Sequence, residues 1–85
     1  MTATNISPAL ESIGYDLTDI PDYCMQPGRI VIAIADNDDD EAEKTIKKLR
    51  RNLPKGAKAE WTGSSDTNGD GYTTSDCAIT WEEEA

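Results

Sequence analysis

A dense group of acidic side chains lies in the middle of the chain. Residues 36–43 contain six carboxylates: Asp36, Asp38, Asp39, Asp40, Glu41 and Glu43. Clustered carboxylates can bind a divalent metal ion, cap a helix, or present negative charge to a basic partner. Capping accounts for only two or three of them, so the surplus favours a partner-binding surface over metal binding or plain solubility. We therefore predict that these six residues bind a partner.

The charge of the whole chain points to the same kind of partner. Seventeen acidic and eight basic residues give a net charge of -9 over 85 residues, and seven of the eight basic residues fall within residues 44–58. This charge repels nucleic acid and anionic membranes and speeds encounter with basic surfaces. The basic stretch alone would suggest nucleic-acid binding, but the acids on the same helix neutralise part of it, through pairs such as Glu43 and Lys47. We expect a basic protein partner.

A second set of oxygen donors alternates along residues 66–71. Asp66, Asn68, Asp70 and Gly71 have a spacing that resembles the first half of the calcium loop of EF-hand and dockerin proteins, which implies calcium ligands at the first three. The resemblance covers this loop only, and Cys77 stands where the family has its closing acid. Asn-Gly and Asp-Gly are also preferred dipeptides of hairpin turns. We predict a turn without an ion, with a calcium-binding module as the alternative.

The sequence offers little support for catalysis. It contains no histidine, no glycine-rich phosphate loop and no serine-centred elbow, and a domain of this size leaves little room for a substrate cleft between paired acids. Trp61 and Trp81 are typical of core or sheet-face packing. Cys24 and Cys77 lack metal-ligand spacing and are interpreted as reduced, buried thiols, with a disulfide as the alternative. We predict that the chain is not an enzyme and needs no cofactor.

The elements that must position these residues begin with a short helix and a strand. Residues 7–14 start with serine and proline and end with glycine, which predicts a helix of about two turns. Residues 15–28 predict a packed loop. The stretch Arg29–Ala35 is rich in β-branched residues and predicts a central strand, with Ile30, Ile32 and Ile34 on one face and small apolar residues on the other.

A long helix and a hairpin complete the fold. Acids precede bases across residues 38–53, as the helix dipole prefers, and four apolar residues form one inward stripe before Pro54: Ala42, Ile46, Leu49 and Leu53. Residues 57–64 and 72–82 alternate in polarity and predict a hairpin around residues 65–71. The prediction is one α+β domain over residues 1–85: a short N-terminal helix, then a β-α-β-β unit whose three-stranded, mainly antiparallel sheet carries the long amphipathic helix. Residues 1–6 and 82–85 are expected to be mobile.

These observations lead to a functional hypothesis. We predict a small acidic protein-protein interaction module that inhibits a larger protein by occupying its basic, nucleic-acid-binding surface. In size, charge and lack of catalytic groups the chain is similar to phage anti-CRISPR proteins and other DNA mimics, although no motif takes part in this analogy. A non-inhibitory accessory subunit is the other alternative. The chain lacks an apolar run of membrane-spanning length and an N-terminal signal sequence, which predicts a soluble, cytoplasmic protein.

Overall fold

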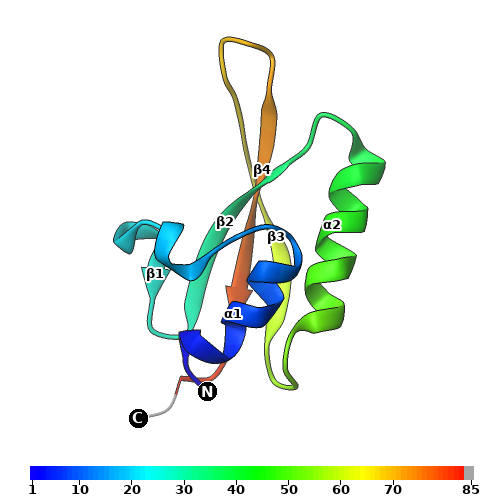
Figure 1. Ribbon diagram of the computed structural model, residues 1–85. Coiled ribbons are helices and arrows are strands. Elements are labelled where there is room, and N and C mark those ends of the chain that lie inside the picture. Colours follow the sequence, from blue (N-terminus) through cyan, green and yellow to red (C-terminus); the bar gives the residue numbers. More distant parts are fainter. Residues whose placement is uncertain (84–85) are drawn as a thin grey trace.

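The computed structural model describes residues 1–83 and consists of two helices on one antiparallel sheet (Figure 1). The elements are α1 (Ala3–Ser12), two short 3-10 helices η1 (Leu17–Asp19) and η2 (Asp22–Cys24), β1 (Met25–Gln26), β2 (Arg29–Ala35), α2 (Asp39–Asn52), β3 (Lys58–Thr67) and β4 (Thr73–Thr80). The strand order is β1-β2-β4-β3, and all neighbouring strands are antiparallel. The predicted α+β class is confirmed, with four strands in place of three.

The additional strand, β1, lies within the segment that was predicted to be a loop. Met25 pairs with Ile30, and Gln26 pairs with Arg29, so β1 and β2 form a tight hairpin. Gly28 makes this turn possible, because its φ of 78° disfavours other residues and a Cβ there would lie 2.8 Å from the Trp81 carbonyl oxygen. A strand of two residues is too short to show the alternation of polar and apolar side chains from which a strand is predicted.

The N-terminal helix begins earlier than the sequence predicted. Thr2, not Ser7, is the N-cap, and the Thr2 backbone N–H donates to Asn5 Oδ1 over 2.8 Å. Pro8 therefore lies inside α1, where it removes one internal hydrogen bond. Burial of Ile6 against the core stabilises this first part of the helix. Residues 3–6, which we expected to be mobile, are thus helical.

The core lies between the two helices and one face of the sheet. Ile30, Ile32 and Ile34 of β2 are buried together with Ile79 of β4, and the helices cover them with Ile6, Leu10, Ile46 and Leu49. The predicted stripe of α2 is confirmed, because Ala42 is buried as well and Leu53 packs against the core. On the other face of β2, Val31 and Ala35 are half-buried and Ala33 is exposed. Both helices pack on the isoleucine face, so the second face is covered only in part.

The turn of the hairpin β3–β4 is shorter than the sequence predicted, because β3 extends further along the chain. Asp66 and Thr67 belong to β3, where they pair with Thr74 and Thr73, so the turn is confined to residues 68–72. The pairing shifts register between Trp61 and Ser65, around Gly63 with a φ of 89°. The hairpin tip projects beyond the rest of the sheet (Figure 1), and the longest dimension of the molecule is 42 Å.

The chain after β4 is held against the turn between β1 and β2. Trp81, directly after β4, is buried, and its backbone N–H donates to the Gly28 carbonyl over 3.0 Å. Its indole N–H donates to the Glu83 carboxylate. The expected mobility of the C-terminal tail falls in part on residues 84–85, which lie outside the described residues.

Neither α1 nor α2, the α-helices of residues 1–83, is long and apolar enough to cross a membrane.

Candidate functional site: an acidic cleft

The six predicted partner-binding acids lie where β2 passes into α2, and they have different roles there. Asp38 is the N-cap of α2, and its Oδ1 accepts the backbone N–H of Asp40 over 2.9 Å. Asp39, Asp40 and Glu41 form the first turn of the helix with exposed side chains. Their negative charge at this end is favourable to the helix dipole. Helix capping therefore employs one carboxylate directly, while Asp39, Asp40 and Glu41 remain exposed to solvent.

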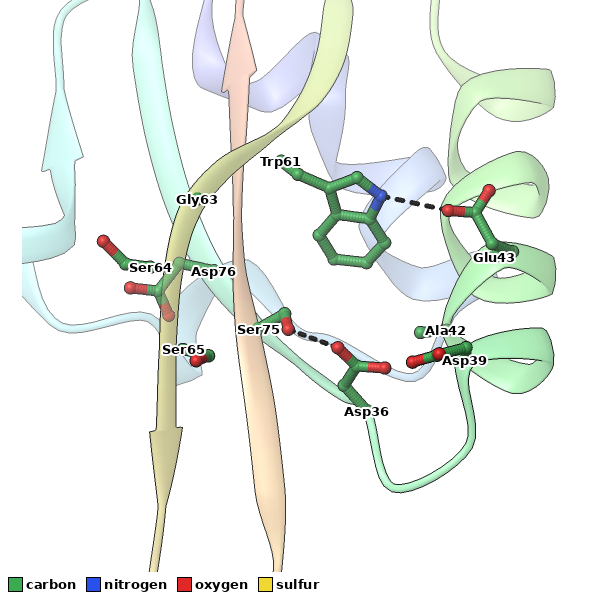
Figure 2. Close-up of a pocket in the computed structure, with 10 residues that line it drawn as sticks. All are labelled: Asp36, Asp39, Ala42, Glu43, Trp61, Gly63, Ser64, Ser65, Ser75 and Asp76. Carbon is green, nitrogen blue, oxygen red and sulfur yellow. Dashed lines mark hydrogen bonds between the residues drawn. The ribbon is translucent and has the colours of Figure 1, made fainter.

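A cleft of about 430 Å³ lies between the start of α2 and the strands β3 and β4 (Figure 2). Three of the predicted acids line it, Asp36, Asp39 and Glu43, whereas the other three do not. The residues that line this acidic cleft are Asp36, Asp39, Ala42, Glu43, Trp61, Gly63, Ser64, Ser65, Ser75 and Asp76. No sequence pattern associates Trp61, Ser75 or Asp76 with these acids. One feature of the sequence did indicate part of the cleft: Asp39 and Glu43 are four residues apart, so they share a face of α2.

Trp61 forms one side of the acidic cleft. It is half-buried, it packs against the edge of the core, and its Nε1 donates to Glu43 Oε1 over 3.3 Å. Figure 2 shows the indole ring reaching from β3 towards α2, above Asp36 and Asp39. The contact with Glu43 holds the ring in the cleft and connects the hairpin to the helix.

Asp36 forms the base of the acidic cleft. Ser75 Oγ donates to Asp36 Oδ2, and the Asp36 backbone N–H donates to the Thr73 carbonyl over 2.8 Å. Asn37 Oδ1 accepts the Thr73 backbone N–H over 2.7 Å, so the link between β2 and α2 is fixed to β4. Asp36 Oδ1 is buried and has no hydrogen-bond partner within residues 1–83. A buried carboxylate oxygen without a donor is unusual and leaves negative charge uncompensated beside the cleft.

Asp76 contributes less to the acidic cleft than its position in the lining suggests. Neighbouring residues of a strand point to opposite faces of the sheet. Figure 2 accordingly shows Ser75 directed towards Asp36, and the Asp76 carboxylate on the other side of β4. The carboxylates that share the acidic cleft with the Trp61 ring are therefore those of Asp36 and Asp39, below the ring, and of Glu43, which accepts its N–H (Figure 2).

The residues of the alternative calcium site lie in different parts of the hairpin. Asp66 is part of β3, and Asn68 Oδ1 accepts the backbone N–H groups of Asp70 and Tyr72, each over 3.0 Å. Gly71 closes the turn with its N–H donating to the Asn68 carbonyl over 3.1 Å. The Asn68 oxygen is therefore employed in the turn itself. Over residues 1–83, no three His, Cys, Asp or Glu side chains are arranged to hold a metal ion.

Both cysteines are free thiols, and the predicted burial is confirmed for Cys77 but not for Cys24. Cys77 is buried in the core, and this burial raises the pKa of its thiol to about 11, with the positive charge of Arg50 opposing the increase. Cys24 is only half-buried. Neither cysteine lines the acidic cleft.

Comparison of the chain with protein-family models, curated proteins and solved structures found no match. A site with three carboxylates, hydroxyl groups and an indole ring is suited to cationic groups, because the carboxylates attract positive charge and the ring face does so as well.

Proposed function

We propose that this chain is a small acidic interaction module that inhibits a larger protein by occupying its basic, nucleic-acid-binding surface. The observation that carries the proposal is the exposure of the acids: 14 of the 16 acidic residues within residues 1–83 have exposed side chains, and Asp36 and Asp76 are half-buried. The core therefore uses none of them. A surface of this charge attracts a basic surface and accelerates their association.

The arrangement of the charges favours one end of the molecule as the binding surface. α2 begins at the end from which the hairpin projects and runs towards the opposite end (Figure 1). The acids of residues 36–43, the acidic cleft, and Asp66 and Asp70 of the hairpin are thus gathered towards the hairpin end. The last turn of α2 carries Arg50 and Arg51 away from it. This separation of charge would orient the hairpin end towards a basic partner.

Inhibition would follow from steric and electrostatic blockade. A protein surface that binds phosphates with lysine and arginine cannot hold nucleic acid while carboxylates occupy the same side chains. Phage anti-CRISPR proteins and DNA mimics work in this way, and the chain shares their small size and acidity. The proposal includes no catalysis and no cofactor, and it includes a cytoplasmic location, where such targets are accessible.

The proposal is tested by capture and competition. The immobilised chain is exposed to a nuclease-treated bacterial lysate at low and at high salt, and retained proteins are identified. We expect basic nucleic-acid-binding proteins that elute at high salt, and we expect nucleic acid to compete with the chain for each of them. Retention of no basic protein would contradict the proposal. Simultaneous binding of nucleic acid and the chain would instead favour a non-inhibitory accessory subunit.

A further inference from the structure

The acidic cleft has properties that select one kind of cationic side chain. We propose that it is a socket for a single arginine side chain of the partner, with the guanidinium group lying against the Trp61 ring and bonded to Asp39 and Glu43. The inference rests on the proposed function, because it assumes a basic protein partner, and it specifies which residue of that partner is recognised and where.

The shape and lining of the acidic cleft support a side-chain ligand. Its volume of about 430 Å³ is in the lower range of small-ligand sites, sufficient for one extended side chain. Trp61 is the residue of the lining with the largest flat surface, and half-buried tryptophan is a common anchor of protein interfaces. The hydrogen bond from Trp61 Nε1 to Glu43 holds the ring in place before binding, which lowers the entropy lost on association.

The described lining of the acidic cleft contains acidic side chains and no basic ones. No lysine or arginine of residues 1–83 is among the residues that line it, although α2 carries several on its other turns. Asp36 Oδ1, at the base, is also without a hydrogen-bond donor. The three carboxylates that line the acidic cleft therefore favour a positively charged group from a partner.

Arginine fits this lining better than lysine does. A guanidinium group is planar, stacks on an indole ring, and can bond two carboxylate oxygens at once, whereas an ammonium group is a compact and strongly hydrated charge. Glu43 uses one bond to Trp61, and a carboxylate can accept several. The site should therefore distinguish the two residues, which a diffuse acidic surface would not do.

The test compares an oligo-arginine and an oligo-lysine peptide of equal length. Each is titrated into the intact chain carrying Trp81→Phe, in which the fluorescence comes from Trp61, and calorimetry on the unsubstituted chain provides an independent affinity. We expect the arginine peptide to bind about tenfold more tightly than the lysine peptide and to change the Trp61 emission.

Three variants connect this preference to the acidic cleft. Trp61→Leu removes the ring, and Glu43→Gln removes a charge while its amide oxygen can still accept from Trp61. Both should reduce the preference to within about twofold. Glu60→Gln is the control, since Glu60 is an exposed acid of β3 outside the cleft and the change in net charge equals that of Glu43→Gln. Its preference should remain.

The outcomes separate this inference from the proposed function. Equal, salt-sensitive binding of both peptides would overturn the arginine socket and leave the acidic module intact. A preference that persists in both Trp61→Leu and Glu43→Gln would also overturn the socket. Absence of binding by either peptide at low salt would contradict both proposals.

Discussion

Arg50 Nε donates to the carbonyl oxygen of Ala59 over 2.8 Å, which ties the last turn of α2 to the outer edge of the sheet. Ala59 belongs to β3, and β3 is an edge strand because the order is β1-β2-β4-β3. An unpaired edge invites the addition of a strand from another molecule. The Arg50 side chain occupies one of these backbone acceptors, and the register shift around Gly63 interrupts the edge further along.

The first prediction concerns this contact. Arg50→Ala should lower the free energy of unfolding by about 1 to 2 kcal/mol, because the Ala59 carbonyl loses a charged donor. It should also increase concentration-dependent self-association, measured by sedimentation, because the edge becomes available. Arg51→Ala is the matched control, with the same change of charge in the same turn, and should alter stability by less than about 0.5 kcal/mol. Similar losses in the two variants would show that the hydrogen bond contributes nothing specific.

The second prediction concerns the first turn of α2. Replacing Asp38, Asp39 and Asp40 together with asparagine should slow association with a basic partner at low salt and leave the fold intact, with a modest loss of stability because these charges favour the helix dipole. Asparagine caps a helix as well as aspartate does, so the Asp38 contact with the Asp40 N–H is retained while three charges are lost. Stopped-flow mixing at several salt concentrations measures the rate. An unchanged association rate would exclude this turn from the binding surface.

The third prediction concerns the stripe of α2. Leu49 is wholly buried, and Leu49→Ala should cost about 2 to 5 kcal/mol in denaturant unfolding, a large part of the stability of a small domain. Leu53→Ala removes the same atoms from a half-buried position and should cost less. Equal losses of stability in the two variants would mean that the loss does not depend on how deeply the side chain is buried.

The fourth prediction concerns the hairpin turn. Excess calcium or a chelator should leave the melting temperature unchanged, because Asn68 Oδ1 already accepts two backbone N–H groups and calcium requires six to eight oxygen ligands. A bound ion at a hundredfold excess over its dissociation constant would add about 2.7 kcal/mol, which is readily detected. A calcium-dependent shift that Asp66→Ala or Asp70→Ala abolishes would replace the turn with a metal site.

The sequence predicted the elements whose signals are local. β2 was predicted with the observed bounds, because a run of β-branched residues lies between Gly28 and Asp36. α2 was predicted from its charges and its apolar stripe. The start of α1 was misplaced because Pro8 resembles a first helical residue, and only the burial of Ile6 shows otherwise.

The features that the sequence did not reveal depend on tertiary contact. β1 exists because two residues pair with β2, and no two-residue pattern could predict it. The acidic cleft depends on the contact between Trp61 and Glu43, which are 18 residues apart in the sequence. The packing of the hairpin on α2 brings these two residues together. The sequence indicated which acids were in excess, and the fold determined that, of the six predicted acids, Asp36, Asp39 and Glu43 share the cleft with an aromatic ring.

The last prediction follows from the raised pKa of Cys77. Its thiol is neutral in the core and titrates at about 11, whereas an unburied thiol titrates at 9.0. Between these values the unfolded state binds fewer protons than the folded state, so the free energy of unfolding falls as pH rises from 9.0 to about 11. The loss should reach about 2 to 3 kcal/mol.

Urea unfolding at a series of pH values measures this loss. Tyrosines and lysines also titrate in this range, so the informative quantity is the difference between the intact chain and Cys77→Ala, in which the thiol contribution disappears. Cys24→Ala is the control, because it removes the other thiol and leaves Cys77 in place, and it should keep the dependence that Cys77 causes. The thiol should also react slowly with iodoacetamide at pH 9.0, since alkylation requires the thiolate. An identical pH dependence in the intact chain and Cys77→Ala would show that ionisation of the Cys77 thiol does not contribute to the pH dependence of the stability.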